Sequence, residues 1–511
     1  MLPEFYQLAQ NLICGLYLKA GVLCSARKLF RLHSLVYYCS LSQKLLAIWY
    51  WYNKMKKLII ILAAAAMTGC GIYKPYTRPE VKTDGLYGTA ETADTTTIGN
   101  LGWEEMFTDP YLRTLIRQGL ENNTDLQSAQ WRVKEAEATL KSARLAYLPS
   151  FNFAPQGSMS SFDWATPGKT YSIPVTASWQ IDIFNGLTNA KRKSKALYLQ
   201  SKEYEQAVKT QLISGIANLY YTLLMLDGQY EVTEQTAGKW RESVRTMRAL
   251  KEAGMANEAA VAQYEGNCLA IEASLHDLEY QIRQAENSLC SMLAEGPHPI
   301  ERGRLESQQL PDDLTVGIPV QMLSNRPDIR SAEYSLMQSY YATSEARSAL
   351  YPSITLSGTL GWTNNSGARI VDPGKFLWSA AASLLQPIFN ANANRARVKI
   401  AKAQQEETKL AFQQALLNAG AEVNNALTQC QSARAKTDLR TQQIEALERA
   451  VESTELLMKH GSTTYLEVLT AQQSLLSAQL NQIADRFGEI QGIVNLYQAL
   501  GGGRDIAAEA K

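Results

Sequence analysis

The sequence predicts an α+β membrane protein made of two internal repeats, each with two transmembrane β-strands and a long coiled-coil helical hairpin. Two pairs of repeated phrases support this prediction. "ARLAYLPSFNF", from Ala143, returns 203 residues later as "ARSALYPSITL", from Ala346. "EAGMANEAAV" and "KHGSTTYLEV", which end at Val261 and Val468, lie 207 residues apart. The similar offsets indicate a unit of roughly 200 residues that occurs twice, which is too few copies for a solenoid.

Proline placement and apolar periodicity predict the hairpins. No proline occurs between Pro174 and Pro297, or after Pro387, so very long helices are possible there. We expect one hairpin at about 188–296 and the other at about 391–500, each with its first helix near 90 Å long at 1.5 Å per residue. Apolar residues recur every seven positions, which is typical of coiled-coil packing. In the first repeat they are Leu212, Leu219, Leu226, Trp240 and Met247, with Ile216, Leu223, Tyr230, Ala237 and Val244; in the second, Leu469, Leu476, Ile483, Ile490 and Tyr497, with Leu480, Phe487 and Val494.

Alternating segments predict the strands, at about 150–184 and 353–389. In "YSIPVTASWQIDIF", from Tyr171, one face holds Ile173, Val175, Ala177, Trp179, Ile181 and Ile183, and the other holds Ser172, Thr176, Ser178, Gln180 and Asp182. The clearest strands have about 10–12 residues, which suits a tilted membrane crossing. An aromatic girdle at the lipid–water boundary is expected from Tyr171, Trp179, Trp362 and Trp378.

Four strands are too few to close a transmembrane barrel, for which about eight is the smallest bacterial case. An open sheet edge is prohibitive in lipid, because unpaired backbone groups find no water there. The chain must therefore oligomerise if these strands lie in a membrane. Three copies would supply a 12-stranded β-barrel and, with the hairpins, a helical tube below it.

Composition excludes several function classes. Residues 70–511 hold 42 Lys and Arg against 48 Asp and Glu, a net charge of −6, which argues against a nucleic-acid partner. The histidines are scattered, and no Cys/His cluster has the spacing of a metal site. No nucleophile elbow, phosphate loop or dinucleotide fingerprint occurs. The sequence thus predicts neither an enzyme nor a bound cofactor or metal.

The N-terminal region predicts export and lipid attachment. "MKKLIIILAAAAMTGC", from Met55, has a cationic start, a short apolar run and a small-residue end, as in a secretory signal peptide. "MTGC" resembles a bacterial lipobox, which implies cleavage before Cys70 and a covalent lipid on that residue; the alternative is an ordinary signal peptide with an incidental cysteine. We therefore expect residues 55–69 to be a lipoprotein signal peptide. Residues 1–54 then have no evident role, and we expect translation to start at Met55, with 1–54 a mis-called upstream extension.

Three motifs resemble TolC-like outer-membrane efflux proteins, specifically NodT-type outer-membrane lipoproteins. They are "RPDIRSAEYSLMQSYYATSEARSALYPSITL" from Arg326, "WEEMFTDPYLRTLIRQGLENNTDLQSAQWRVKEAEA" from Trp103 and "YLEVLTAQQSLLSAQL" from Tyr465. The resemblance covers about Cys70 to Gly503. It implies a trimeric duct with a 12-stranded barrel in the outer membrane and an α-helical barrel in the periplasm. It further implies a periplasmic adaptor and an inner-membrane transporter, commonly of the resistance–nodulation–division class.

The resemblance also sets the expected organisation of the chain. Repeat 1 is expected at 103–296 and repeat 2 at 320–500. An N-terminal anchor and equatorial segment at 70–102 and an equatorial linker at 297–319 contribute to a collar, and 501–511 form a C-terminal tail.

In such ducts the hairpin tips form a periplasmic iris and dock the adaptor. The candidate iris residues are Glu258, Thr463, Thr464, Tyr465 and Glu467. Relatives often carry aspartates where this chain has threonines, so the two glutamates are the remaining acids that can attract cations. The alternatives are that each glutamate is a solvated helix-start residue, favoured by the helix dipole, and that Tyr465 packs in its hairpin. Gly254 and Gly461 are expected to form the turns, since a left-handed residue ends a helix at little cost.

Basic residues follow each second strand, in "NAKRKSKA" from Asn189 and at Arg395, Arg397 and Lys399. They either contact phospholipid headgroups or are simply solvated.

The predicted function is a passive, lipid-anchored exit duct of a tripartite pump that exports drugs or metal ions. A type I protein-secretion duct is the alternative, and a non-conducting surface coiled-coil protein is a third reading.

Overall fold

The computed structural model describes residues 74–80, 86, 97–311, 316, 325–364, 375–460 and 462–504. Contacts divide the chain at Lys74, and the elements below belong to the unit Pro75–Lys511. Cys70, the expected signal peptide 55–69 and the upstream residues 1–54 lie outside the described residues, as does Gly461. No helix within the described segments combines the length and hydropathy that a membrane crossing requires.

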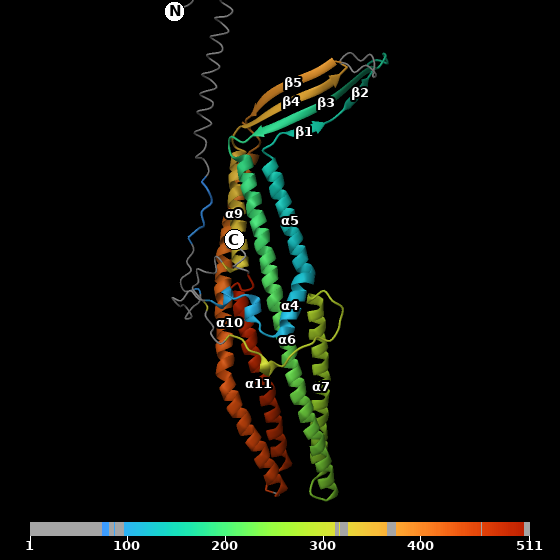
Figure 1. Cartoon of the computed structure of the whole chain (residues 1–511), viewed down its shortest axis with the longest axis vertical. Coiled ribbons are helices and arrows are strands. Elements are labelled where there is room, and N and C mark those ends of the chain that lie inside the picture. Colours follow the sequence, from blue (N-terminus) through green and yellow to red (C-terminus); the bar gives the residue numbers. More distant parts are fainter. Residues whose placement is uncertain are drawn as a thin grey trace, which may run out of the picture. The chain divides into compact units, whose positions relative to one another are not determined.

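The two repeats have helices of equal length. The paired helices are α5 (Thr124–Leu145) and α9 (Pro327–Ser348), of 22 residues; α6 (Gly186–Glu252) and α10 (Ala393–Lys459), of 67; α7 (Glu258–Met292) and α11 (Tyr465–Ala499), of 35. Helix α6 forms a hairpin with α7, and α10 forms one with α11 (Figure 1). The predicted fold class, two repeats with long helical hairpins and strands, is confirmed.

Shorter elements accompany the first repeat and the link between repeats. They are η3 (Ile98–Asn100), α3 (Trp103–Met106), α4 (Pro110–Asn122) and η4 (Leu305–Ser307). Helix α4 packs against α6, and η3 packs against α11. Of these elements, η3 and η4 lie in the segments expected to form the equatorial collar, whereas α3 and α4 lie at the start of repeat 1.

The helices begin at residues whose local chemistry favours a start. Both long helices follow an asparagine in the left-handed region, Asn185 before α6 (φ 56°) and Asn392 before α10 (φ 66°). Asparagine tolerates this conformation better than most residues.

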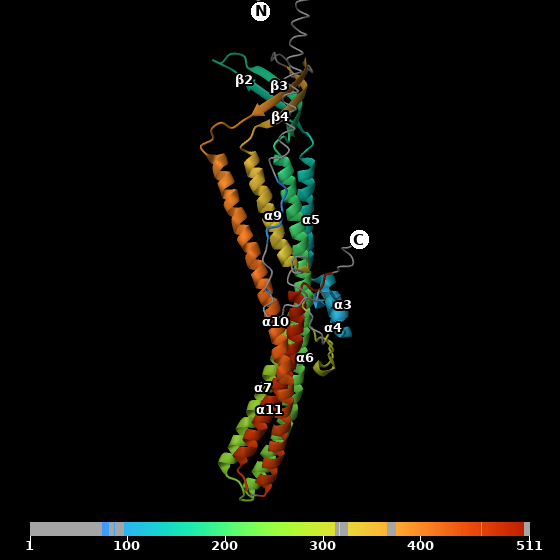
Figure 2. The ribbon, with the colours of Figure 1, turned by 90° about the vertical axis from the view of Figure 1, so that its left-hand side faces the viewer.

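Near the sheet the helices lie side by side. Helix α6 lies between α5 and α9, and α9 lies between α6 and α10 (Figure 2). These four helices therefore form one curved layer, in the order α5, α6, α9, α10.

The seven-residue repeats largely coincide with the helical core. Leu212, Leu226, Trp240 and Met247 of the first track are buried, whereas Tyr230 of the second is only half-buried. A large core surrounds Tyr220, Tyr497 and Phe412, and a smaller cluster near the hairpin tips surrounds Trp240 and Tyr264. The hairpins are thus held by two separate apolar clusters rather than by one uniform seam.

Within the described residues, five strands form one antiparallel sheet. They are β1 (Ser150–Phe153), β2 (Gln156–Ser160), β3 (Gly168–Ile181), β4 (Ser353–Thr363) and β5 (Lys375–Leu385). Both β1 and β2 pair with β3, so they are one interrupted strand, and the sheet has the four predicted positions in the order β1/β2, β3, β4, β5. The expected alternation reached Ile183, but β3 ends at Ile181. The cause is Asp182, whose carboxylate accepts hydrogen bonds from the backbone N–H groups of Leu187 and Thr188 at the start of α6, at 3.0 and 2.8 Å.

A proline lies in the middle of the sheet, where it removes a ladder hydrogen bond. Pro174 of β3 faces Gly361 of β4. A Cβ atom on residue 361 would lie 2.2 Å from the backbone oxygen of Ile173, so this position requires glycine. On its other side Pro174 lies opposite the interruption between β1 and β2, where its carbonyl accepts from the N–H of Ala154 at 3.3 Å, so its missing donor faces a break in the neighbouring strand.

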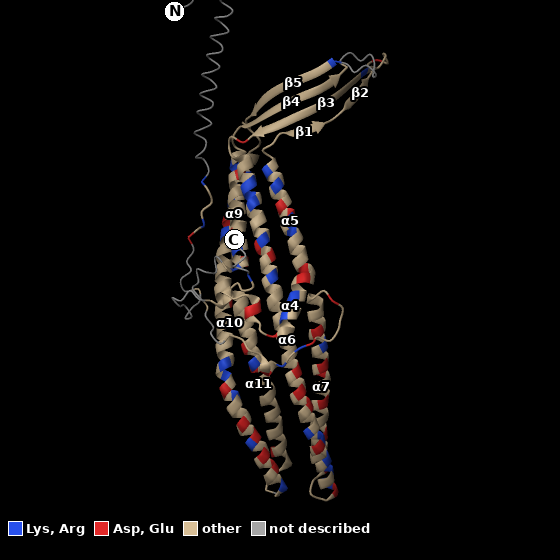
Figure 3. Cartoon of the chain, in the orientation of Figure 1, with Lys and Arg blue, Asp and Glu red and all other residues tan. Residues whose placement is uncertain are grey.

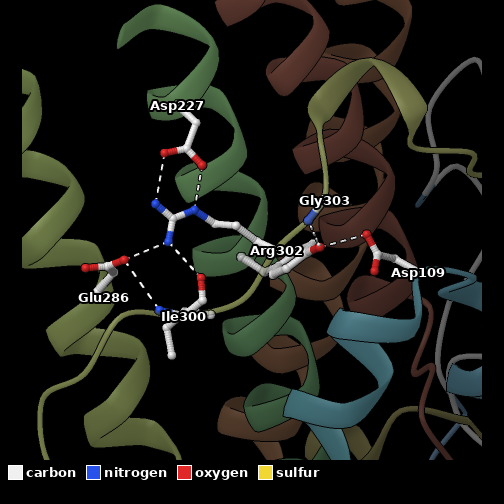
Figure 4. A network of polar contacts seen from close by, with 7 residues as sticks. Asp109, Asp227, Glu286, Ile300, Arg302 and Gly303 are labelled. Atoms are coloured by element: carbon white, nitrogen blue, oxygen red, sulfur yellow. Dashed lines mark hydrogen bonds and ion pairs between the residues drawn. The ribbon is translucent and has the colours of Figure 1, made fainter. Parts of the chain in front are cut away.

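Arg302 fastens the segment after α7 to both helices of the first hairpin (Figure 4). Its guanidinium donates to the carboxylate of Asp227 on α6 at 2.5 and 2.9 Å, and to Glu286 on α7 at 2.6 Å. The hydrogen bonds to Asp227, with those to Glu286, raise the pKa of Arg302 above its usual value, although burial acts in the opposite direction. The guanidinium therefore keeps its charge and holds two carboxylates that would otherwise repel each other.

Tyr220 forms a second connection at this level. Its hydroxyl donates to Asp109, the N-cap of α4, at 2.7 Å, and accepts from the backbone N–H of Gly303 at 3.1 Å. Gln308 also donates to Asp109, at 2.7 Å. The segment after α7 is thereby tied to α4 as well as to the hairpin.

Replacing Arg302 with alanine should lower the free energy of unfolding by about 3 kcal/mol, because it leaves the buried Glu286 and the half-buried Asp227 without a cation. Thermal unfolding of the detergent-solubilised protein, followed by circular dichroism, measures this. Arg304→Ala is the matched control, since Arg304 is 76% exposed and reaches only Glu231, at 4.0 Å. Equal unfolding temperatures for the two variants would show that the network does not stabilise the hairpin.

Candidate channel wall and helical tips

The sheet has one apolar and one polar face. Residues opposite each other in neighbouring strands share a face, and the register pairs Ile173 with Trp362, Val175 with Leu360, and Trp179 with Leu356. In β5 the same face continues through Phe376, Trp378, Ala380, Ala382 and Leu384. The other face is lined mainly by hydroxyl groups, from Thr176, Ser178, Thr355, Ser357, Thr359, Ser379 and Ser383. Such a sheet fits a wall between lipid and an aqueous pore.

The structure places the predicted girdle residues at different heights on the apolar face. Trp362 lies at the end of the sheet remote from the helices, with its ring 5.9 Å from that of Phe376. Tyr171 lies beside this end, where its carbonyl accepts a hydrogen bond from the backbone N–H of Asn364 at 3.2 Å. Trp378 lies two residues further along β5 from Phe376 and is 71% exposed.

Trp179 lies towards the opposite end, where the strands join the helices. Its indole N–H donates to the carbonyl of Tyr147, at 2.9 Å. Phe184 lies just after β3 and Tyr351 just before β4, and their rings stack with centroids 5.0 Å apart. Phe184 and Tyr351 were missed as candidates, and the available signal was their position next to the strand ends, where an aromatic girdle would lie.

Neither outer edge of the sheet is paired in the described part of the chain. One edge is formed by β1 and β2, the other by the eleven residues of β5, all of which are exposed. Exposed edges of this length are templates for pairing with another chain.

The first tip is closed by the predicted glycine. Gly254 has φ +80°, and its N–H donates to the carbonyl of Lys251 at 2.9 Å. Asn257 caps α7 by accepting from the N–H of Ala260, at 2.9 Å. Glu258, the first residue of α7, forms an ion pair with Lys251 on the other side of the turn. This candidate iris acid is therefore paired with a cation of its own hairpin.

The second tip has a different arrangement. The hydroxyl of Thr463 donates to the carboxylate of Glu467 in the first turn of α11, and the side chain of Thr464 makes no capping hydrogen bond. Tyr465 is partly buried against the cluster in which Leu469, one turn further along α11, meets Trp240 of the first hairpin. Glu258 and Tyr465 occupy the same position in the two repeats, the first residue of the return helix. The two candidate acids are therefore not related by the internal repeat.

The hairpins also touch each other above the tips. Gln473 of α11 donates to the side-chain oxygen of Asn267 on α7, at 3.1 Å. Leu469 of α11 is buried in the cluster formed by α6 and α7. Within the cluster, burial raises the pKa of Tyr264 to about 12, so this phenol stays neutral. Any movement that separates the two hairpins at this level has to break these contacts.

Comparison with known proteins agrees with this geometry. A sequence profile of the family described as Outer membrane efflux protein matches residues 115–295 and 318–502. The cation efflux system protein CusC of Escherichia coli O6:H1 is 29% identical over 463 residues, which cover 88% of this chain and 98% of CusC. The probable outer membrane lipoprotein SilC of Salmonella typhimurium is 27% identical, over 88% of this chain and 98% of SilC.

Solved structures show the same fold. The open state of the MtrE outer membrane channel of Neisseria gonorrhoeae superimposes with a TM-score of 0.76 at 25% identity, covering 85% of this chain and 98% of MtrE. This protein is accordingly an outer membrane channel of the efflux type and not an enzyme. Because the profile matches more than half of its length, in two segments that correspond to the two repeats, the chain belongs to the outer membrane efflux protein family.

Proposed function

We propose that three copies of this chain close a 12-stranded barrel and form a passive trimeric exit duct for small molecules, drugs or metal ions. An inner-membrane transporter of the resistance–nodulation–division class delivers the cargo through a periplasmic adaptor. The observation that carries this proposal is the sheet: it has a lipid-compatible face, a hydroxyl-lined face and two unpaired edges.

Backbone energetics favour closure by identical chains. Each unpaired backbone group in the hydrocarbon costs several kcal/mol, so an eleven-residue edge such as β5 cannot face lipid. Pairing β5 with the β1/β2 edge of a neighbouring copy satisfies both edges at once. Three copies of a four-position sheet supply twelve strands, a number within the range of bacterial barrels.

The polar face suits passive export. Its hydroxyl side chains carry no charge, so a lumen lined by them neither traps cations nor excludes anions strongly. Selection of cargo then lies with the transporter. The relative CusC is named for cation efflux, which favours small-molecule export over the secretion of polypeptides.

The remaining candidate residues receive roles within this duct. Tyr171, Trp179, Trp362 and Trp378 anchor the barrel at the membrane boundaries, and the lipid on Cys70 anchors the N-terminus. At the tips, Glu258, Thr463, Thr464, Tyr465 and Glu467 line the iris, and the turns at Gly254 and Gly461 dock the adaptor. Since Lys251 pairs with Glu258, we assign the cation preference of the iris to Glu467.

Two adjacent alanines of β5 test the orientation of the wall. Ala380 lies opposite Gly358 on the apolar face, and Ala381 lies opposite Ser357 on the hydroxyl face. Ala380→Arg should reduce the amount of trimer in the outer membrane, because an arginine in mid-bilayer costs about 2–4 kcal/mol. Ala381→Arg should leave the trimer intact and shift the reversal potential of reconstituted channels towards anion selectivity. The reverse outcome, or wild-type protein that is a monomer without ion current, would refute the proposed duct.

Glu467→Gln tests the iris. This substitution removes the charge but keeps an acceptor for Thr463, so the helix start should be preserved. We expect the ratio of cation to anion permeability to fall, as measured from reversal potentials in a salt gradient across planar bilayers. Glu121→Gln, at the exposed surface of α4, makes the same charge change away from the tips and should leave the ratio unchanged. An unaltered ratio in Glu467→Gln would exclude this residue from the constriction.

A further inference from the structure

The segment that follows Cys70, the expected lipid-attachment site, identifies the outer face of the layer formed by α5, α6, α9 and α10. Arg78 forms a bidentate ion pair with Glu333 of α9, at 2.7 and 2.6 Å, and the ring of Tyr76 lies 5.7 Å from that of Tyr340. Further along the chain, Leu86 packs against Gly420 of α10, where an added Cβ would lie 2.7 Å from the Leu86 carbonyl oxygen. A chain tethered to the membrane at Cys70 runs outside a closed tube, so these contacts mark the outer face. This step rests on the lipid-anchored duct proposed above.

Helical spacing extends this face along α10. Lys402 and Gly420 are 18 residues apart, which is five full turns of 3.6 residues, so Lys402 lies on the face that Leu86 covers further down. Arg395 and Lys399 precede Lys402 by seven and three residues and share its side of the helix. Arg397 lies on the opposite side, because it is two residues from Arg395. The predicted group Arg395, Arg397 and Lys399 is thus divided between two faces.

The same face continues on α6, and the adjacent sheet-side end of α5 also carries exposed cations. The guanidinium of Arg192 lies 5.8 Å from the ring of Tyr341, which packs against the Tyr340 that Tyr76 touches. Lys195 follows Arg192 by three residues on this face. On α5, Lys141 and Arg144 are exposed beside the exposed Leu145 and Leu148.

The aromatic contacts link this region to the lipid-facing side of the sheet. Thr188, one turn before Arg192, shares a 2.9 Å hydrogen bond with the hydroxyl of Tyr147, whose carbonyl accepts from Trp179 on the apolar face. The cations therefore lie just below the helix-side end of the apolar face.

Positive charge strongly predominates at the helix ends that adjoin the sheet. Segments 141–147, 186–196, 345–351 and 391–402 together hold eleven Lys and Arg and one acid, Glu345. The six residues Lys141, Arg144, Lys195, Arg395, Lys399 and Lys402, which we call the basic band, are exposed and have no carboxylate partner among the described residues. Figure 3 shows the blue residues gathered at the sheet-side ends of α5 and α6.

The hairpins nearer the tips show the opposite arrangement. There the cations are largely paired, as in Arg241 with Glu272, Arg434 with Glu489 and Arg440 with Asp485. Ion pairs within the chain are thus common along the hairpins, although exposed cations such as Lys239 and Arg245 occur there too. The band differs in that six exposed cations without a carboxylate partner gather at the helix ends that adjoin the sheet.

We propose that the basic band binds the phosphate groups of anionic phospholipids in the periplasmic leaflet of the outer membrane. Arg144 and Arg395 lie within one turn of the sheet-side helix ends, and Lys402 is nine residues, about 14 Å, from the start of α10. The headgroup layer is about 5–8 Å thick, and lysine and arginine side chains extend their charges towards it. The band thereby fixes the depth of the barrel, while the aromatic residues anchor its apolar surface.

The test measures lipid preference of the full-length acylated trimer in phosphatidylcholine vesicles that contain spin-labelled phosphatidylglycerol or spin-labelled phosphatidylcholine. The wild-type protein should immobilise the anionic lipid about threefold or more over the zwitterionic one, and 1 M NaCl should abolish this preference. The triple variant Arg395→Gln, Lys399→Gln, Lys402→Gln should lose at least half of it. The control triple Lys239→Gln, Arg245→Gln, Arg283→Gln removes the same charge from exposed positions on α6 and α7 nearer the tips and should retain it.

A second triple, Lys141→Gln, Arg144→Gln, Lys195→Gln, repeats the test on α5 and α6 and should also lower the preference. Equal preference in wild type and both band variants overturns the inference, as does an equal loss in the control triple. A changed reversal potential with unaltered lipid preference also overturns it, because the cations would then face the lumen. In each of these outcomes, ion conduction by wild-type trimers would still support the proposed duct. Failure of the lipid-binding inference can therefore be distinguished from failure of the proposed function.

Discussion

Backbone hydrogen bonding in lipid is the constraint on which the rest of this structure depends. One chain supplies four strand positions, and its two sheet edges expose backbone groups that the hydrocarbon cannot satisfy. Internal duplication gives each chain two equivalent pieces of wall, with helices of matching length beneath each strand pair. Matching lengths matter because strands and helices have to close around the same axis at the same level. A longer helix in one repeat would displace its hairpin tip from that of the other.

The two repeats keep their helix lengths but differ in the contacts that hold them. The first hairpin is fastened by Arg302 between Asp227 and Glu286, whereas the second carries Glu489 between Arg434 and Arg486, at 2.8 and 2.6 Å. In the first hairpin one cation bridges two carboxylates, and in the second one carboxylate bridges two cations. Charge networks can thus diverge after duplication while helix geometry is retained, because the geometry is fixed by apolar burial and each network only has to leave no buried charge without a partner.

Much of the architecture could be predicted from sequence because it depends on local periodicity. The seven-residue pattern that includes Leu212, Leu226 and Trp240 reports burial in the helical core. The alternation from Ile173 to Ile181 reports which side chains share one face of the sheet. Contacts between distant side chains leave no such signal. Coordinates were needed to find three such contacts. They are the ion pair of Glu258 with Lys251, the packing of Tyr465 against the tip cluster, and the close approach of the backbones at Gly361 and Pro174. The end of β3 was misplaced for a similar reason, since the capping role of Asp182 outweighs an alternation that continues to Ile183.

The distribution of charge along the helices follows from what surrounds them. Along the hairpins nearer the tips many cations lie beside a carboxylate of the same chain, as Arg241, Arg434 and Arg440 do. Near the sheet the surroundings change to the anionic surface of a membrane, and a carboxylate there would be repelled by it. Acids are accordingly almost absent from the helix ends that adjoin the strands. The same membrane thus determines both the apolar face of the sheet and the sign of the charge on the first turns of the helices below it.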